Sequence, residues 1–322
     1  CCAQQTSLDD SLQMTLSSPS PTAAHALVLL CFFGVSVCYR PVVLMHGILG
    51  TAADLDELAA MIRADFTGIS VKSVEIVSNP YYDSLFMNMN EQVEQFARAV
   101  RSDVQLKNGF NLVAHSQGGL IARAYIERYN SPSVHNFVSL AGPHGGQFGV
   151  PEFNAICPDD LCPWLVDLFS GILDHNQIWS DEVQEHFSFA AYWHDPFDQA
   201  QFVAQSIFLA DINNVRPTKN STYKSNFVSL NQLVLLHSLN DTVIIPRQSP
   251  TFSFYQYVNG GNDSVIVPMR STPDYVGDWI GLQTLDKAGK VTTPAVWCSH
   301  EDLPNYSCRQ VVYDPWVKPF LN

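Results

Sequence analysis

The chain has 322 residues, of which 46% are hydrophobic and 15% are charged. This is a globular composition, and the length suits one large α/β domain or two small ones. Its formal net charge is −14 and its 17 lysines and arginines form no basic cluster. This argues against nucleic acid as a partner, because phosphate binding depends on Lys and Arg, whereas an acidic balance suits a protein that works at low pH.

Residues 1–38 have the character of a leader. The apolar run AHALVLLCFFGVSVC at 24–38 is too short to span a bilayer comfortably, so we expect no stable transmembrane anchor. Its small residues Ser36 and Cys38 stand at the end of the run, as near the cleavage site of a secretory signal peptide. The first methionine is Met14, where we expect synthesis to begin. The alternative is a buried strand or helix that feeds the fold.

From residue 39 onward, predicted strands and helices alternate. We expect strands at 39–47, 71–77, 110–114 and 134–142, and helices at 53–66, 90–104 and 120–129. This order predicts a mostly parallel central sheet covered by helices, in a single domain over 39–322. The alternation stops between about 147 and 232, where we expect a mainly helical insertion that caps the sheet, and resumes with strands at 231–238 and 293–299.

Cysteine usage fits an oxidising compartment. Cys1, Cys2, Cys31 and Cys38 fall in the leader, and the other four form two close pairs, Cys157/Cys162 and Cys298/Cys308, which we predict to be disulfides. Zinc is the competing interpretation, but these spacings match no common zinc finger, and we predict no metal. Glycosylation sequons, which also suit secretion, occur at Asn220, Asn240, Asn262 and Asn305.

The segment VAHSQGG at 113–119 places Ser116 between a predicted strand and a predicted helix. A strand, a sharp turn and a helix form the nucleophile elbow of α/β hydrolases, where only small residues fit two positions before and after the serine. Here those positions are Ala114 and Gly118, so the motif lacks its first glycine. The alternative is an ordinary polar residue in a turn.

A serine nucleophile needs a base and a carboxylate that orients the base. In α/β hydrolases the carboxylate follows the serine along the chain, and the histidine comes last. Asp241 follows the strand at 231–238, and His300 follows the last strand. His144, His194 and His237 are rival bases, and Asp195 and Asp211 are rival acids. We expect His115 to point away, because adjacent side chains on a strand face opposite ways. The backbone N–H groups of Gln117 and Ile48 are the predicted oxyanion hole.

From residue 40 onward the chain resembles the palmitoyl-protein thioesterases, and more closely their lysosomal type-1 branch. The resemblance rests on HSQGG, GPHGGQFGVP, AYWHDP, SIFLADINN, LNDTVIIP and LQTLDKAGK, in that order. It implies Ser116 as nucleophile, Asp241 as acid and His300 as base, with Ile48 and Gln117 at the oxyanion hole. It further implies a Cys157–Cys162 disulfide and glycans at Asn220 and Asn240. The chain departs from the branch at Ala114, where glycine is usual, and at Cys298-Ser299-His300-Glu301, where Gly-Asp-His-Leu is usual.

The resemblance implies a hydrolase that cleaves long-chain acyl thioesters of S-acylated proteins, peptides and acyl-CoA, without a cofactor, in the lysosome or outside the cell. An acyl chain needs an apolar groove, since its burial contributes about 0.8 kcal/mol per CH₂. The groove candidates in the insertion are Trp164, Leu165, Leu168, Phe169, Ile172 and Leu173. The alternatives are an oxyester lipase or lysophospholipase on the same fold, an inactive fatty-acid-binding protein, and, for the apolar stripe, simple packing.

Overall fold

The computed structural model describes residues 39–76, 79–155, 157, 162–174, 177–257 and 265–321. All of them belong to the second of two compact units of the chain, Tyr39–Asn322. The predicted signal peptide, the start at Met14, the four leader cysteines and the sequon at Asn262 lie outside the described residues.

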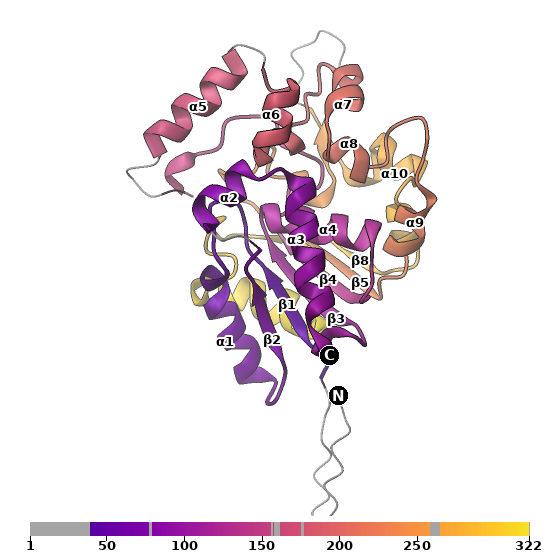
Figure 1. The fold of residues 1–322 in the computed structure, drawn as a ribbon. Helices are drawn as coiled ribbons and strands as arrows, with labels where there is room; N and C mark the ends of the chain where they lie inside the picture. Colours follow the sequence, from indigo (N-terminus) through magenta and orange to yellow (C-terminus); the bar gives the residue numbers. More distant parts are fainter. Residues whose placement is uncertain are drawn as a thin grey trace, which may run out of the picture. The chain divides into compact units, whose positions relative to one another are not determined.

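The central sheet is parallel throughout the described residues, as predicted. Its strands lie in the order β2-β1-β3-β4-β5-β8, and β9 also pairs with β5 (Figure 1). The strands are β1 (Val42–Met45), β2 (Val71–Val74), β3 (Phe110–His115), β4 (Val134–Leu140), β5 (Gln232–Ser238), β8 (Val291–Thr292) and β9 (Ala295–Val296). A separate antiparallel pair is formed by β6 (Phe254–Tyr255) and β7 (Ile266–Val267).

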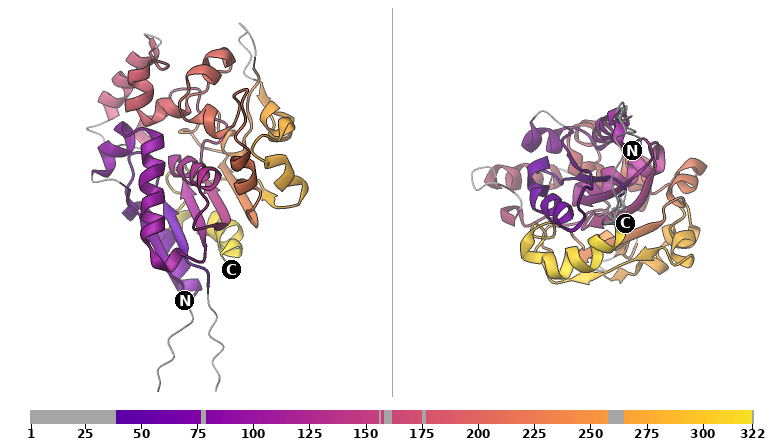
Figure 2. Two further views of the ribbon diagram at one scale, coloured as in Figure 1. Left: turned by 45° about the vertical axis from the view of Figure 1, so that its right-hand side comes forward. Right: turned by 90° about the horizontal axis from the view of Figure 1, so that it is seen from below.

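Both faces of the sheet are buried, which explains why its strands are continuous apolar runs. Along β1, Val42 and Leu44 face one core and Val43 and Met45 face the other. The first core is closed by α1 (Asp56–Asp65) and the C-terminal helical segment Arg309–Val317, and the second by α3 (Met89–Ser102) and α4 (Gln117–Arg128) (Figure 2). With its parallel sheet and two helical layers, the unit has the α/β-hydrolase fold.

Helices replace strands between β4 and β5. In Figure 1 the first of them lie at the top of the view, above the sheet, where the strands β3 and β4 lead. They are α5 (Cys162–Asp174), α6 (Asp181–His186), α7 (Gln199–Gln205), α8 (Leu209–Ile212) and α9 (Ser221–Phe227). The remaining helices are α2 (Pro80–Phe86), α10 (Pro273–Gly277) and α11 (Leu282–Lys287).

The end of the sheet differs from the prediction of one strand at 293–299. Two short strands, β8 and β9, pair with β5 on either side of Pro294. Proline has no N–H and breaks a hydrogen-bonded ladder, so the pairing is interrupted there. The chain leaves the sheet after Val296, and His300 stands on the following loop.

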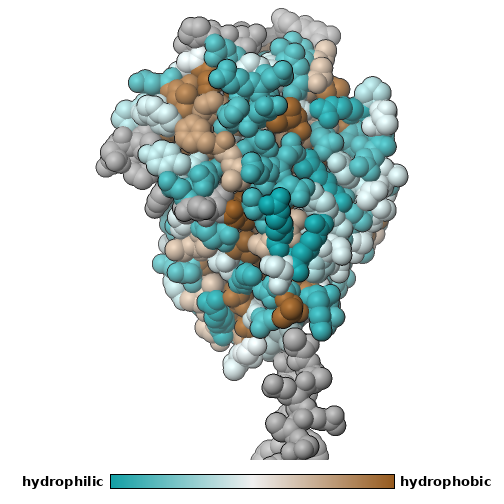
Figure 3. Space-filling model, in the orientation of Figure 1, coloured by the Kyte–Doolittle hydropathy of each residue, from teal (hydrophilic) through white to brown (hydrophobic). Residues whose placement is uncertain are grey.

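No helix in the described part of the chain has the length and apolar character needed to cross a membrane. Apolar side chains nevertheless reach the surface of the insertion. Figure 3 shows brown surface at the upper left, the region where Figure 1 draws α5. On that helix Trp164 is 44% exposed and Val166 is 40% exposed.

Candidate active site

Ser116 stands at a sharp turn between β3 and α4. Its backbone has φ +54° and ψ −131°, a strained conformation for a residue with a side chain. The turn fits only because glycines line it: a Cβ on Gly118 would lie 2.3 Å from the His46 carbonyl oxygen, and one on Gly47 would lie 2.8 Å from the Ser116 Cβ. At Ala114, where the motif lacks its glycine, the methyl group is buried in the core beside α4.

The structure brings Ser116, His300 and Asp241 together from three strand ends. The Ser116 Oγ lies 2.9 Å from His300 Nε2, and His300 Nδ1 lies 2.8 Å from Asp241 Oδ2. All three side chains are buried. With Nδ1 protonated, His300 donates to Asp241 and accepts from the serine hydroxyl, which is the arrangement that removes a proton from serine.

Two backbone groups fix the carboxylate. Asp241 Oδ1 accepts hydrogen bonds from the N–H groups of Val243 and Ile244, each at 2.9 Å. Burial opposes the charge of Asp241, but His300 and these two N–H groups outweigh it and hold the pKa of the carboxyl below its ordinary value. Asp241 is therefore an anion across the physiological pH range.

The same pair sets the state of His300. Burial lowers the pKa of an imidazole, yet the charge of Asp241 and its hydrogen bond outweigh burial and hold the pKa of His300 above its ordinary value. An anion in this position stabilises an imidazolium, so the arrangement can accept a proton from the serine hydroxyl.

The expectation that His115 points away is wrong. Its Nε2 lies 2.9 Å from the His300 carbonyl oxygen, and the two rings are 4.9 Å apart. Strand alternation does not keep the two histidines apart, because the loop that carries His300 folds over the end of β3 and meets the His115 side. Burial and the neighbouring His300 lower the pKa of His115 to about 3, so it is neutral.

The rival residues serve other contacts. His194 Nδ1 bonds the Gly145 carbonyl at 2.7 Å, and burial lowers its pKa to about 4. His144 Nε2 lies 2.9 Å from the Ser139 hydroxyl. Asp211 pairs with Arg128 at 2.8 Å, and Asp195 accepts the N–H of Phe197. His237 stands within β5, where its backbone N–H bonds the Pro294 carbonyl.

Ile48 and Gln117 border the same cavity as Ser116. Among the described residues, no backbone hydrogen bond engages either N–H group, whereas the neighbouring Leu49 N–H donates to Ser84 Oγ at 2.8 Å. The Gln117 side chain donates to the Ser84 carbonyl at 3.0 Å and to Gln92 Oε1 at 3.1 Å. This buried network joins the loop after β1 to the elbow, and no motif in the sequence indicated it.

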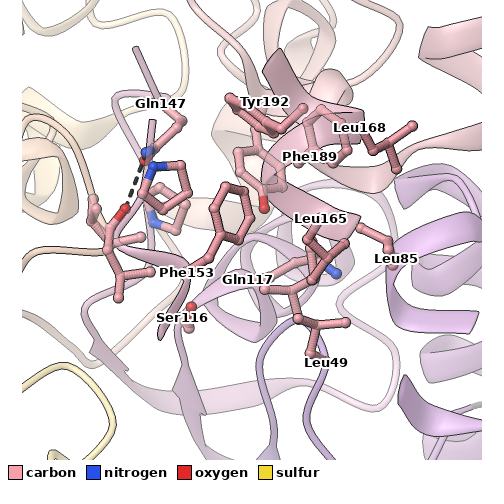
Figure 4. A pocket seen from close by; sticks show the side chains of 16 residues that line it. Leu49, Leu85, Ser116, Gln117, Gln147, Phe153, Leu165, Leu168, Phe189 and Tyr192 are labelled. Atoms are coloured by element: carbon pink, nitrogen blue, oxygen red, sulfur yellow. Dashed lines mark hydrogen bonds between the residues drawn. The ribbon is translucent and has the colours of Figure 1, made fainter. Parts of the chain in front are cut away.

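An apolar cavity opens above Ser116 (Figure 4). Only three of the six groove candidates line it, Leu165, Leu168 and Phe169. They lie on one stripe of α5, since a helix turns only every third or fourth residue toward one side. Trp164 packs against Phe86 with its ring centroid 6.0 Å away and is largely exposed, and Ile172 and Leu173 lie beyond the cavity. The prediction missed these lining residues: Leu85, Phe153, Phe189, Tyr192, Val243 and Ile244.

Both predicted disulfides are present. Cys157 and Cys162 are joined at the start of α5, and Cys298 and Cys308 are joined on either side of His300. Asn220 and Asn240 are exposed, as glycosylation would require, and Asn305 is half-buried. No group of three or more metal-binding side chains occurs in the described ranges.

Fold and site together define a hydrolase of the α/β-hydrolase class. A family profile described as palmitoyl protein thioesterase matches residues 41–300. The chain therefore belongs to the palmitoyl protein thioesterase family, and it is a thioesterase.

Curated relatives agree over most of the chain. Palmitoyl-protein thioesterase 3 of Dictyostelium discoideum is 40% identical, with 92% of this chain and 98% of that protein covered. Palmitoyl-protein thioesterase 1 of Caenorhabditis elegans is 32% identical, with 87% and 91% covered. The lysosomal thioesterase PPT2 homolog of Drosophila melanogaster is 33% identical, with 83% and 87% covered. These names span three types, so they do not single out the type-1 branch.

Proposed function

We propose that this thioesterase removes long-chain fatty acyl groups, palmitoyl among them, from the cysteines of S-acylated proteins and peptides and from acyl-CoA. One observation carries the proposal: the Ser116 hydroxyl is hydrogen-bonded to His300 at 2.9 Å and stands at the floor of an apolar cavity. In this arrangement the hydroxyl can attack the thioester carbonyl while the apolar walls bind the acyl chain.

In the proposed acylation step, Ser116 Oγ attacks the thioester carbonyl carbon and its proton passes to His300 Nε2. The oxyanion accepts hydrogen bonds from the N–H groups of Ile48 and Gln117, and losing one such donor typically costs about 10²–10³ in rate. The C–S bond then breaks, the sulfur keeps the bonding electron pair, and His300 returns the proton to it. The products are a free thiol and an ester of Ser116.

In the proposed deacylation step, a water molecule attacks the Ser116 ester while His300 accepts the water proton. The ester C–O bond breaks and Ser116 recovers the proton from His300, so the fatty acid is released and the enzyme is regenerated. Asp241 stays ionised in both steps and holds the imidazole in the required tautomer.

The apolar cavity is narrow, with a volume of about 40 Å³. A long acyl chain can therefore enter only if side chains along α5 and its neighbours move apart. Each CH₂ that becomes buried returns about 0.8 kcal/mol, which supports such an opening for long chains and not for short ones. We accordingly expect activity to rise with chain length.

The test combines a variant with a covalent probe. Ser116→Ala should abolish hydrolysis of palmitoyl-CoA and of S-palmitoyl peptides, and a fluorophosphonate should label the wild type but not the variant. Unchanged circular dichroism would show that the variant is folded. Activity within tenfold of wild type would contradict the role of Ser116, and faster cleavage of a matched oxyester than of the thioester would favour a lipase.

Placement in the type-1 branch and in the lysosome or the extracellular space also belongs to this proposal. The branch rests on the motifs WHDP and FLADINN, and a family tree that puts the chain elsewhere would contradict it. The location rests on the disulfides and the exposed sequons. Fractionation of cells that express the full chain tests the location. Glycosidase treatment of the protein tests for glycans at Asn220 and Asn240.

A further inference from the structure

Ser116 also borders a second cavity, which is acidic where the first is apolar. This acidic cavity has a volume of about 350 Å³ and lies between the loop after β1, the start of α1 and the loop that carries His300. Ile48 and Ser116 line both cavities. A thioester whose carbonyl is bound at Ser116 therefore has one cavity available for its acyl chain and another for its thiol group.

Four carboxylates line the acidic cavity: Asp54, Asp56, Glu57 and Glu301. Among the described residues that line it, none is a lysine or an arginine. Two histidines are present, but His115 is neutral and His46 is engaged with Glu75 at 3.1 Å. The cavity therefore carries a concentrated negative charge next to the proposed nucleophile.

The start of α1 accounts for only part of this charge. Acidic residues favour a helix N-terminus because of the helix dipole, and Asp54 also accepts the Thr51 N–H at 2.7 Å. Glu301 has no such role: it comes from a different part of the chain, directly after His300, and faces the same space. Desolvation and the nearby carboxylates, Asp54 first among them, raise the pKa of Glu301, as expected for like charges held close together.

We propose that the acidic cavity binds the leaving-group side of the thioester and selects cationic leaving groups, namely S-acylated cysteines flanked by lysine or arginine. This rests on the proposed function, because it assigns the apolar cavity to the acyl chain and leaves the acidic cavity for the thiol. The same charge disfavours the phosphates of coenzyme A. Acyl-CoA is then the poorer substrate of the two kinds.

The test uses three octanoyl thioesters of short peptides, acetylated and amidated at their ends, in which the acylated cysteine is flanked by Lys, Gln or Glu. At low ionic strength we expect kcat/KM to be at least about tenfold higher for the Lys peptide than for the Glu peptide, because several partly screened charges act together. High salt should reduce this ratio. Octanoyl-pantetheine, which lacks the phosphates, should be hydrolysed faster than octanoyl-CoA.

The variants Asp56→Asn and Glu301→Gln each remove one charge from the cavity. Each should lower the Lys-to-Glu ratio about threefold, and the double variant should bring it close to one and narrow the gap between pantetheine and CoA thioesters. Glu185→Gln is the matched control: it removes one exposed carboxylate from α6, far along the chain from this cavity, and should leave the ratio unchanged.

Two results would overturn the inference while the function stands: a ratio within twofold in the wild type although the Gln peptide is hydrolysed, or an equal effect of Glu185→Gln, which would attribute the preference to net charge. Failure to hydrolyse both these octanoyl thioesters and their palmitoyl counterparts would instead reject the proposed function, and this inference with it.

Discussion

At the scale of single residues, the proposed chemistry depends on the charge that Asp241 places beside His300. A base accepts the serine proton only when it is neutral, so the acylation rate should fall as pH decreases through the pKa of His300. Asp241 raises that pKa against the effect of burial. The acidic side of the pH profile of the acylation rate therefore measures the effect of Asp241 on the pKa of His300.

We predict that Asp241→Asn lowers kcat/KM for thioester hydrolysis roughly 10³–10⁴-fold, because the amide no longer holds the correct tautomer. The midpoint of the acid limb should also move to lower pH, since burial lowers the His300 pKa and only the charge of Glu301 then opposes it. A pH profile of kcat/KM for both proteins measures the two effects. An unshifted midpoint would show that Asp241 does not set the pKa of the base.

His115→Ala is the comparison for His300→Ala. Removal of His115 takes away one hydrogen bond to the His300 carbonyl, worth about 1 kcal/mol, so we expect a loss of about five- to tenfold. Removal of His300 should cost several orders of magnitude. Single-turnover acylation rates compare them, and equal losses would mean that His115 takes part in the chemistry.

At the scale of elements, the loop that carries His300 is held by Cys298–Cys308 and by the hydrogen bond of the Ser238 hydroxyl to the Cys298 carbonyl. We predict that replacing both cysteines with serine lowers the free energy of unfolding by about 2–3 kcal/mol and also lowers kcat. Replacing Cys157 and Cys162 is the control, since that bridge lies at the start of α5 and should leave kcat for short acyl chains unchanged. Urea unfolding measures the stability and steady-state kinetics measure kcat. An unaltered kcat in the variant without Cys298 and Cys308 would show that this disulfide does not position His300.

Helix α5 provides a matched pair of leucines, one on the stripe that faces the apolar cavity and one outside it. Both Leu168 and Leu173 are half-buried, but only Leu168 lines the cavity. We predict that Leu168→Ala lowers the ratio of kcat/KM for palmitoyl over butyryl thioesters about threefold to tenfold, because it removes apolar surface along the chain. Leu173→Ala should leave the ratio as in wild type. Similar ratios in both variants would place the acyl chain elsewhere.

The sequence predicted the strands and helices better than it predicted the contacts between them. Parallel strands and their helices were predictable because burial on both faces leaves continuous apolar runs, and Asp241 and His300 followed from the order of strand ends. Contacts between distant segments were not predictable: nothing local indicates that Glu301 lines the same cavity as Asp56 or that Gln92 meets Gln117. For α5, composition identified six apolar residues, but only the helix orientation decides which three reach the cavity.

At the scale of the whole molecule, buried titratable groups make folding depend on pH in two opposite ways. Glu127 lies 3.5 Å from Arg123, yet its oxygens accept no hydrogen bond among the described residues, and burial raises its pKa to about 8. His115 and His194 have pKa values lowered by burial to about 3 and about 4, respectively.

The signs follow from which state binds more protons. Between the unfolded pKa of Glu127, 4.5, and its folded value of about 8, the native state binds the extra proton, so stability falls as pH rises toward 8. Between about 4 and 6.5 the unfolded state binds extra protons at the two histidines, so stability falls as pH decreases. We therefore predict a maximum of the free energy of unfolding near pH 6.5, about 2 kcal/mol above the value at pH 8.

Urea unfolding followed by circular dichroism from pH 4.5 to 8 measures this curve. Glu127→Gln should flatten its alkaline side, and Glu185→Gln, an exposed change, should not. A wild-type curve that is level between pH 6.5 and 8 would mean that Glu127 is ionised in the native protein.

The position of Ser116 between two cavities also determines what can intercept the reaction halfway. In the proposed reaction, departure of the thiol leaves the acyl ester among the apolar walls and makes the acidic cavity accessible to a new acceptor. Water is one such acceptor, but a small cationic thiol or amine would be concentrated there by the same carboxylates. With the acyl chain and the leaving group placed as proposed, the enzyme should transfer acyl groups to a cationic thiol or amine as well as to water, and the ratio of transferred to hydrolysed acyl groups measures this.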